Sequence, residues 1–333
     1  MTVERNTALI SNSADIFENL ALEDWIYSKC TFSAGACLLL LWRDQPCVVI
    51  GRHQNPWTEV NVSKCQKMGI PISRRNSGGG TVYHDLGNIN FSFMTNRQDY
   101  NRKNNLTVIR DFLEQTYGIG SEISPREDLV TRDGKLKISG TASKLARINA
   151  YHHCTLLVHV DVNKMRCAIR KESPAILMSR ATSSVRSDIT NLSQLREGLE
   201  ADVIMQQVAD LHSQSDVFMV TPTELMFPSM SERSARLSSW DWIFGKTPRF
   251  ATQIEYNDSV EPVTLMMRVN GGLIEEATAS TEIREIGDLT LTGCKFVREE
   301  VEERLLLWSL MEDDHLLACN ICKAADKLFD QVT

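Results

Sequence analysis

The sequence has 333 residues, of which 42% are hydrophobic and 24% are charged, and its formal net charge is −7. This composition is typical of a globular chain long enough for two domains, and it excludes a largely disordered protein. The negative net charge and the lack of a dense Lys/Arg run exclude nucleic acid as the main partner.

Nine cysteines are scattered along the chain, several of them in apolar runs. We interpret them as reduced, buried thiols, because an odd, scattered set does not suggest a disulfide framework. Cys319 and Cys322 form a lone C-x-x-C without the second pair that a zinc site needs. The longest apolar run, 37–42, is too short to cross a membrane, and residues 1–10 show no targeting pattern. We therefore expect no metal site, no membrane span and no transit peptide in this sequence.

The N-terminal part predicts a helix followed by two strands. Apolar residues recur with helical spacing over 16–26, after Asn12 and Ser13, whose short polar side chains can cap the helix. Two continuous apolar runs, 38–42 and 48–50, indicate buried strands joined by a turn.

The segment 74–88 is the most unusual in the chain, because two arginines run directly into three glycines. Ordered glycines lose much conformational entropy on folding, so they occur where the backbone needs positive φ or where a ligand approaches closely. Arg74 and Arg75 can neutralise a phosphate, and the amides of 78–80 can form an anion-binding nest. The spacing matches neither of the standard phosphate-loop motifs. By itself the segment fits an anion-binding loop and a tight hairpin about equally.

The elements after this loop follow from simple patterns. Alternation over 89–93 predicts a strand in the same sheet as the loop, and apolar spacing over 106–113 predicts a helix. A strand then begins at 126–130 and reaches a turn at Asp133 and Gly134.

The next predicted strand, 135–139, enters a loop of small residues. Lys135 and Lys137 share one of its faces, so we expect one lysine to point inward, where it can bind a phosphate or a polarised carbonyl. The alternative is a solvated strand face. His152 and His153 project to opposite faces of a later strand and cannot chelate one metal together. We expect one histidine to line a pocket and the other to be structural.

The last third of the chain predicts a loop, a helix and a second domain. The hydroxyl-rich loop 180–191 is a candidate lid over an anionic ligand or else a surface connection, and a helix follows at 201–212. The aromatic segment 240–244 leads into Gly and Pro residues that indicate a boundary. We therefore divide the chain into domains of residues 1–247 and 248–333.

Four segments, in their order and spacing, resemble the lipoate-protein ligase and lipoyltransferase family: 51–57, 74–85, 137–143 and 151–157. The segments 12–21 and 240–248 resemble its animal mitochondrial lipoyltransferases in particular. The likeness covers nearly the whole chain and weakens after about residue 250. It implies an α/β (α+β) fold, with a mixed-sheet catalytic domain of the biotin and lipoate ligase type and a small C-terminal accessory domain.

The resemblance also implies the activity. The enzyme would transfer a lipoyl group from lipoyl-AMP to the ε-amine of a lysine, on lipoyl domains of the E2 components of 2-oxo acid dehydrogenase complexes and on glycine-cleavage H protein. One alternative is a full lipoate-protein ligase, which would also need Mg²⁺ and ATP. Less favoured alternatives are an octanoyl or lipoyl amidotransferase that uses a thioester on Cys154, and a non-catalytic adenylate-binding module. The resemblance further implies a monomer in the mitochondrial matrix, without a membrane or nucleic-acid partner.

Carried onto this sequence, the resemblance makes Lys137 the catalytic residue, which would bind the phosphate and acyl oxygens. The implied lipoyl-AMP site comprises Arg75, Ser77, Gly78, Gly79, Gly80, Thr81, Val82, Tyr83, Asn88, Arg126, Asp128, Lys137, His153, Thr155, Thr182, Ser183 and Ser184. Lys144 stands where bacterial ligases commonly carry an arginine, yet 184–192 resembles their adenylate-binding loop, so the transferase and the full ligase both remain open. Because the net charge is negative, we expect a local basic rim with Arg52, Lys144 and Arg147 to attract an acidic acceptor.

Overall fold

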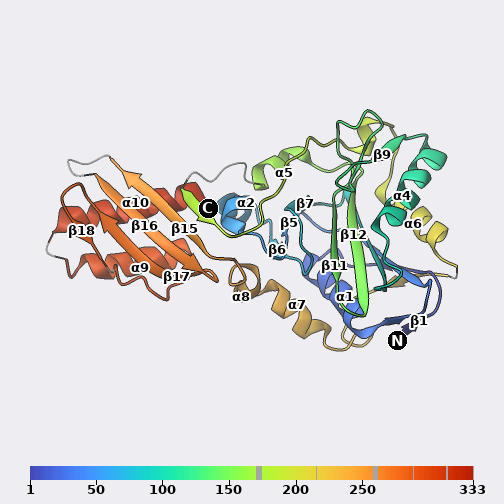
Figure 1. Ribbon diagram of the computed structural model, residues 1–333, viewed down its shortest axis with the longest axis horizontal. Helices are drawn as coiled ribbons and strands as arrows, with labels where there is room; N and C mark the ends of the chain where they lie inside the picture. Colours follow the sequence, from blue (N-terminus) through green and yellow to red (C-terminus); the bar gives the residue numbers. More distant parts are fainter. Residues whose placement is uncertain (170–174, 215, 258–261, 288, 313, 333) are drawn as a thin grey trace. The chain divides into compact units, whose positions relative to one another are not determined.

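The computed structural model describes residues 1–169, 175–214, 216–257, 262–287, 289–312 and 314–332 (Figure 1). The chain forms two compact units, each assembled from several segments. The first comprises Met1–Arg52, Pro71–Arg166 and Ser184–Ser239, and the second comprises His53–Ile70, Cys167–Ser183 and Trp240–Thr333. Our division of the sequence between residues 247 and 248 stays a prediction. In space, two earlier segments cluster with the C-terminal residues.

A six-stranded sheet forms the centre of the first unit. From edge to edge its strands are β11 (Thr141–Leu145), β12 (Asn149–Leu157), β8 (Asn88–Asn96), β4 (Cys37–Trp42), β2 (Thr7–Ser11) and β14 (Val217–Val220). β2 runs parallel to both of its neighbours, and the other pairs are antiparallel. The predicted mixed sheet is therefore confirmed.

One face of this sheet carries the main hydrophobic core. Ile89, Phe91 and Phe93 of β8 alternate onto this face and pack in one cluster with α4 (Arg102–Tyr117) and α6 (Ala201–His212). Burying each such side chain stabilises the fold by about 1.5–3 kcal/mol. The predicted strand and the two predicted helices of this layer are confirmed.

The opposite face contains buried polar side chains and is contacted by α1 (Ile16–Lys29). Glu23 of α1 is buried, and it accepts a hydrogen bond of 2.8 Å from Ser92 of β8. A buried carboxylate requires partners of this kind, because removing it from water is otherwise costly. The two faces of one sheet therefore have different chemistry, and the polar face is the one available for a site.

The N-cap of α1 differs from our prediction. Asp15 caps the helix, because its carboxylate accepts hydrogen bonds of 2.7 and 3.1 Å from the amides of Phe17 and Glu18. The prediction that Asn12 or Ser13 provides the cap was wrong. The helix begins directly at its first buried apolar residue, and only the preceding side chain reaches the first free amides.

A three-stranded sheet in the same unit holds the glycine loop. Its central strand, β5 (Cys47–Ile50), runs parallel to β6 (Ile72–Arg74) and antiparallel to β7 (Val82–His84). The loop 75–81 thus connects the two outer strands. Its ends are fixed by their pairing with β5, so the loop has little freedom to change its path.

Two predicted strand assignments were wrong. The strand after the glycine loop, β8, belongs to the six-stranded sheet and not to the sheet of the loop. The chain changes sheets at Gly87, where a Cβ would lie 2.4 Å from the carbonyl oxygen of His159. The residues around Lys137 do not form a strand, because Lys137 makes only single bridges, to Val130 and Ile189.

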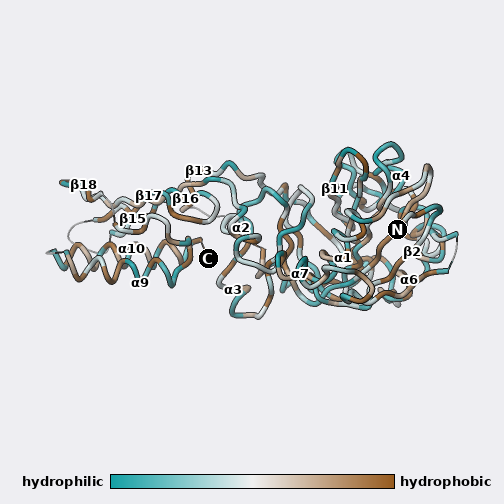
Figure 2. The backbone as a smooth tube through the Cα atoms, turned by 90° about the horizontal axis from the view of Figure 1, so that it is seen from below, coloured by the Kyte–Doolittle hydropathy of each residue, from teal (hydrophilic) through white to brown (hydrophobic). Residues whose placement is uncertain are grey.

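The second unit contains a five-stranded antiparallel sheet. Its strands in order are β13 (Ile176–Ser179), β15 (Phe250–Tyr256), β16 (Val263–Asn270), β17 (Leu273–Ser280) and β18 (Glu285–Ile286). The helices α9 (Arg298–Ser309) and α10 (His315–Val332) lie side by side along this sheet (Figures 1 and 2). Trp57 of α2 (Pro56–Glu59) packs against Phe250 and Phe296, with ring centroids 5.3 Å apart in each pair.

The remaining elements are short. They are β1 (Thr2–Val3), β3 (Thr31–Phe32), α3 (Val62–Lys67), β9 (Ser121–Ile123), β10 (Leu129–Thr131), α5 (Val162–Ala168), a 3₁₀ helix (Leu192–Gln194), α7 (Met230–Ser238) and α8 (Trp240–Ile243). Among the helices that the structure describes, none is both long and apolar enough to cross a membrane.

Candidate active site

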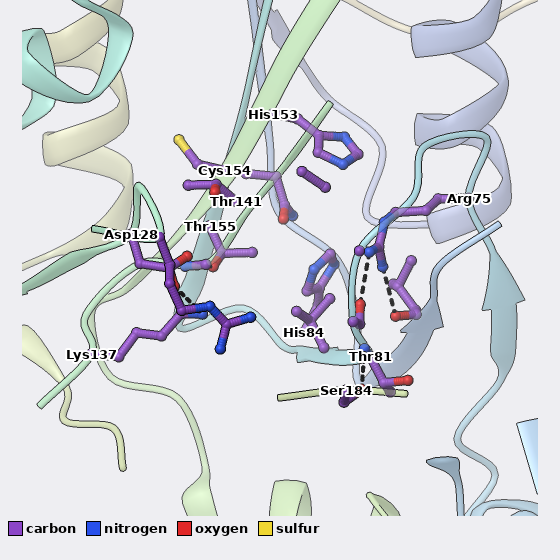
Figure 3. Close-up of a pocket in the computed structure, with 18 of the residues that line it drawn as sticks. Arg75, Thr81, His84, Asp128, Lys137, Thr141, His153, Cys154, Thr155 and Ser184 are labelled. Carbon is purple, nitrogen blue, oxygen red and sulfur yellow. Dashed lines mark hydrogen bonds and ion pairs between the residues drawn. The ribbon is translucent and has the colours of Figure 1, made fainter. Parts of the chain in front are cut away.

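A cavity of about 280 Å³ lies in the first unit (Figure 3). Most of its lining residues come from the glycine loop, the segment that contains Lys137, the helices α1 and α4, and the strands β4, β5, β7, β8, β11 and β12. Apolar and cationic side chains line it together, among them Leu20, Trp42, Val49, Arg102 and Lys137. Such a mixed lining suits a ligand with an acyl chain and an anionic group.

Most residues of the predicted site line this cavity. They are Arg75, Gly79, Gly80, Thr81, Val82, Arg126, Asp128, Lys137, His153, Thr155 and Ser184. Ser77, Gly78, Tyr83 and Asn88 are not among its lining residues, and Thr182 and Ser183 belong to the second unit. Strand alternation explains the place of Tyr83, because its neighbours Val82 and His84 face the cavity and Tyr83 projects the other way.

Arg75 organises the glycine loop from inside. Its Nη2 donates hydrogen bonds of 2.6 and 2.7 Å to the carbonyl oxygens of Gly78 and Gly80, and its Nη1 donates one of 3.1 Å to that of Val49. Burial lowers the pKa of the guanidinium to about 10, which still leaves it charged at neutral pH. The charge of Arg75 is therefore largely committed to the loop itself.

A side chain at Gly79 would be strained and tightly packed. The φ of Gly79 is 85°, and a Cβ would lie 3.0 Å from Nη2 of Arg75 and 3.3 Å from Cβ of Ala142. Only glycine adopts this backbone conformation without strain. Across the loop, Oγ of Ser184 accepts a hydrogen bond of 2.9 Å from the amide of Thr81, which shows that this amide can bind an oxygen.

Lys137 lies on another wall, whereas Lys135 is exposed. Nζ of Lys137 is 3.0 Å from Oδ2 of Asp128, and the side chains of Lys137 and Asp128 are both partly exposed. Gly140 lies beside Lys137, since a Cβ there would be in van der Waals contact with it, 3.5 Å from Nζ. Arg126 and Arg102 line the same cavity. This part of the cavity therefore has more positive than negative charge, as an anion site requires.

The two adjacent histidines have different roles, as predicted. His153 lines the cavity, its Nδ1 lies 3.0 Å from Oε1 of Glu23, and its Nε2 lies 2.8 Å from Oγ of Ser77. His152 is fully buried on the other face and stacks on Phe93. Burial holds the pKa of His152 well below its ordinary value, so it is neutral and structural.

The order Ser77, His153, Glu23 is that of a hydrolase triad, but Ser77 is not placed as a nucleophile. Its Oγ accepts a hydrogen bond of 3.0 Å from Nε of Arg75, and it does not line the cavity. Burial by itself would raise the pKa of Glu23, yet the nearby His153 and the hydrogen bonds from His153 and Ser92 hold it below its ordinary value. The three residues thus form a buried link between α1, β12 and the glycine loop.

Cys154 is a poor nucleophile, although it is one of the residues that line the cavity. Its neighbours His153 and Thr155 face the polar side of the sheet, and Cys154 belongs to the apolar core cluster on the other side. Burial raises the pKa of its thiol, so the reactive thiolate is disfavoured. This geometry argues against a thioester on Cys154.

A second histidine in the cavity, His84, was missed by the sequence reasoning. Its Nδ1 lies 2.9 Å from Oδ2 of Asp44, a buried residue that also accepts hydrogen bonds from Asn19, Trp42 and Asn90. Cys47 lies close to this pair, but the spacing of 2.9 Å is that of a hydrogen bond and not of two ligands around a metal. The resemblance placed Val82 in the site, and strand alternation from Val82 could have identified His84 on the same face.

A protein-family model described as "lipoyl protein ligase A/B catalytic domain" matches residues 15–213. Over 317 residues, the chain is 37% identical to human mitochondrial lipoyl amidotransferase LIPT1, with 90% of this chain and 84% of that protein covered. This chain belongs to the lipoate-protein ligase and lipoyltransferase family. It is also 32% identical to lipoate-protein ligase A of Bdellovibrio bacteriovorus, with 91% of this chain and 92% of that protein covered. The protein is therefore an enzyme of the lipoyl transferase and ligase family.

Solved structures of lipoate ligases share the fold. The crystal structure of Plasmodium falciparum LipL1 in complex with lipoate superimposes with a TM-score of 0.61 at 23% identity, and covers 95% of this chain and 98% of that one. A lipoate-protein ligase A bound with ATP has a TM-score of 0.54 at 20% identity, with 70% and 94% covered. The predicted fold class is confirmed.

Proposed function

We propose that this enzyme transfers a lipoyl group from lipoyl-AMP to the ε-amine of a lysine on a protein acceptor. The observation that carries the proposal is the ion pair of Lys137 and Asp128 on the wall of a cavity that also contains the glycine loop. Lipoyl-AMP combines an acyl chain with a phosphate anhydride, which matches the mixed apolar and cationic lining.

In the proposed reaction the enzyme supplies electrostatic stabilisation and positioning. The acceptor amine attacks the acyl carbonyl, negative charge develops on the carbonyl oxygen and the leaving phosphate, and Lys137 stabilises both. Asp128 holds the lysine in place. The nucleophile comes from the acceptor, so the enzyme needs none of its own. The poor placement of Cys154 is consistent with this route.

We assign the two kinds of lining to the two parts of the donor. Leu20, Trp42 and Val49 would contact the acyl chain, and Arg126 with the amides near Gly79 would contact the phosphate. The predicted contacts of Ser77, Gly78, Tyr83, Asn88, Thr182 and Ser183 with the donor stay predictions. Three of these residues still support the wall of the cavity, because Ser77 and Gly78 bind Arg75 and Tyr83 continues β7.

For the acceptor we propose lipoyl domains of E2 components and glycine-cleavage H protein. A bipartite lipoate-protein ligase from Thermoplasma acidophilum, solved as part of a lipoylation system with its E2 lipoyl domain, shares the fold of this chain with a TM-score of 0.56 at 20% identity. We further propose that the enzyme acts as a monomer in the mitochondrial matrix, since its human and mouse relatives are named as mitochondrial.

A local basic surface supports binding of an acidic acceptor. Lys144, Arg233 and Arg236 all converge on the one carboxylate of Asp24. Three cations around one anion leave net positive charge on a chain whose total is −7. Lys144 belongs to β11, which also provides Thr141 and Ala142 to the cavity wall. We propose this cluster as part of the basic rim predicted from the sequence.

Two other donors are supported by the relatives. The human and mouse proteins are named lipoyl amidotransferases, which favours a lipoyl-lysine amide as the donor. The Bdellovibrio relative is named a ligase, which favours lipoate with Mg²⁺ and ATP.

One experiment separates the three donors. The enzyme is incubated with an apo lipoyl domain and, in parallel, with synthetic lipoyl-AMP, with lipoate plus Mg·ATP, or with lipoylated H protein, and the mass of the acceptor is measured. We expect the lipoyl mass increase with lipoyl-AMP. A mass increase only with lipoylated H protein would contradict our proposal and show that the enzyme transfers the lipoyl group from one lysine amide to another. A mass increase with lipoate plus Mg·ATP would show that the enzyme also has ligase activity.

A further inference from the structure

The proposed function, on which this inference rests, leaves one chemical requirement unassigned. A lysine amine is protonated at neutral pH and has no lone pair in that form, so it must lose a proton before it can attack a carbonyl. Lys137 and the lining arginines are cations that stabilise negative charge. A separate group must accept the proton.

His84 is the lining residue best placed to accept it. The carboxylate of Asp128 is paired with Lys137, and both ring nitrogens of His153 lie at hydrogen-bond distance from Glu23 and Ser77. Nε2 of His84, by contrast, is buried and has no hydrogen-bond partner among the residues that the structure describes. Nε2 of His152 also lacks a partner there, but His84 lines the cavity and His152 does not. A buried ring nitrogen without a partner is costly in a folded protein, and at His84 a bound substrate can supply the missing hydrogen bond.

Asp44 determines which nitrogen of His84 carries the proton. Oδ2 of Asp44 accepts hydrogen bonds from Nε1–H of Trp42 at 3.1 Å and from the side-chain amide of Asn90 at 3.0 Å. Nδ1 of His84 lies 2.9 Å from the same oxygen. An ionised carboxylate only accepts hydrogen bonds, so Nδ1 must be the protonated nitrogen. Nε2 therefore has a free lone pair.

His84 and Lys137 face the same cavity from different walls. Figure 3 shows the ring of His84 reaching from β7 into the cavity, between Thr155 and Arg75. Thr155 pairs with Asn90 in the sheet and accepts a hydrogen bond of 3.0 Å from the amide of Gly140, which lies beside Lys137. Asn90 also donates a hydrogen bond to Asp44, the partner of His84. Asn90 and Thr155 therefore connect the surroundings of His84 to those of Lys137.

We propose that His84, oriented by Asp44, is the general base that deprotonates the attacking lysine of the acceptor. The ε-ammonium gives one proton to Nε2, and the lone pair of the resulting amine forms the N–C bond with the acyl carbonyl. The bond between the acyl carbon and the phosphate oxygen breaks, and AMP leaves with the electron pair of that bond. The amine nitrogen loses its second proton to the departing phosphate oxygen, which yields a neutral amide. The imidazolium then returns its proton to water.

Hydroxylamine provides the test, because it is mainly unprotonated at neutral pH and needs no base to become a nucleophile. The variant is His84→Asn, whose side-chain amide can keep the hydrogen bond to Asp44 and lacks a basic nitrogen. With lipoyl-AMP as donor, we expect kcat for an apo lipoyl domain to fall about 100-fold or more, and the rate of lipoyl hydroxamate formation to change less than about threefold. The matched control is His159→Asn, an exposed histidine of the same unit that does not line the cavity, for which both rates should be unchanged.

The outcomes are distinguishable. Equal losses with both acceptors would show that His84 only positions the donor, and unchanged transfer to the lipoyl domain would show that it is not needed. Either result overturns the proposal. If the wild-type enzyme forms neither product from lipoyl-AMP, the proposed function itself fails.

Asp44→Asn is a second variant, for use if His84→Asn does not fold. An asparagine amide can donate to Nδ1, so it favours the tautomer whose Nε2 carries the proton. We expect it to reduce transfer to the lipoyl domain and to spare hydroxylamine, as a positioning residue should. Loss of both reactions in a folded Asp44→Asn protein would contradict that role.

Discussion

The two cationic walls of the cavity use their charge in opposite ways. Arg75 is buried and donates to three backbone carbonyls, whereas Lys137 is partly exposed and has one carboxylate partner. The first cation maintains the shape of the glycine loop, and the second keeps ammonium hydrogens available for a ligand. An arginine beside a glycine loop is thus not automatically a ligand group, because the loop's own carbonyls can satisfy its charge.

The largest expected effect is on the reaction, at Lys137. Lys137→Ala should lower kcat for lipoyl transfer by about 100- to 1,000-fold, or roughly 3–4 kcal/mol of transition-state stabilisation, and leave the unfolding temperature nearly unchanged. Transfer is measured by acceptor mass and unfolding by circular dichroism. Lys135→Ala is the matched control, since Lys135 is exposed. Wild-type rates in Lys137→Ala would remove this residue from the mechanism.

The next effect is on stability, at Arg75. Arg75→Met should lower the free energy of unfolding by about 2–4 kcal/mol, because the carbonyls of Val49, Gly78 and Gly80 lose their buried donor. Urea unfolding measures the change, with the exposed Arg147→Met as control. A variant of wild-type stability that only binds lipoyl-AMP more weakly would make Arg75 a ligand group and would end the contrast with Lys137.

A smaller effect is expected within the glycine triplet. Gly79→Ala should destabilise the protein by about 1–2 kcal/mol, because alanine is strained at positive φ and its Cβ would meet Arg75 and Ala142. Gly78→Ala is the control, since a Cβ there has no atom within 4 Å and its φ is not in the left-handed region. Equal effects of the two substitutions would contradict the close approach of Gly79 to Arg75.

The smallest effect concerns the link between Glu23 and His153. The pKa of Glu23 is below 4.5 in the folded state, so its contribution to stability is present above that pH and is lost as the pH falls toward the folded value. Glu23→Gln should therefore flatten the decline of unfolding free energy as the pH falls below about 4.5. Urea titrations at several pH values measure the slope. An unchanged acid slope would show that the pair contributes no pH-dependent stability.

Local patterns predicted much of the fold correctly. The helix predicted at 201–212 has the observed bounds of α6, and the strand predicted at 89–93 lies within β8. The alternation of His152 and His153 predicted correctly that one of them is structural and the other faces the cavity. These features depend on burial with a period of two or about four residues, and such periods are visible in any short stretch of sequence.

Other parts of the site were not predictable, because their partners are distant in sequence. Asp44 and His84 are 40 residues apart, and Glu23 and His153 are 130 residues apart. The strand order brings each pair together, and no local period encodes that order. The same limit applies to β8, whose alternation predicted a strand but not which sheet it joins.

The sequence by itself determined the ingredients of the site: three glycines after two arginines, a lysine before a small-residue loop, and a family pattern that links them. Only the tertiary structure decided how each charge is used. The hydrogen-bond partners of Arg75, Lys137 and His84 depend on which backbone and carboxylate groups the two sheets bring within about 3 Å, and that proximity is a property of the folded chain.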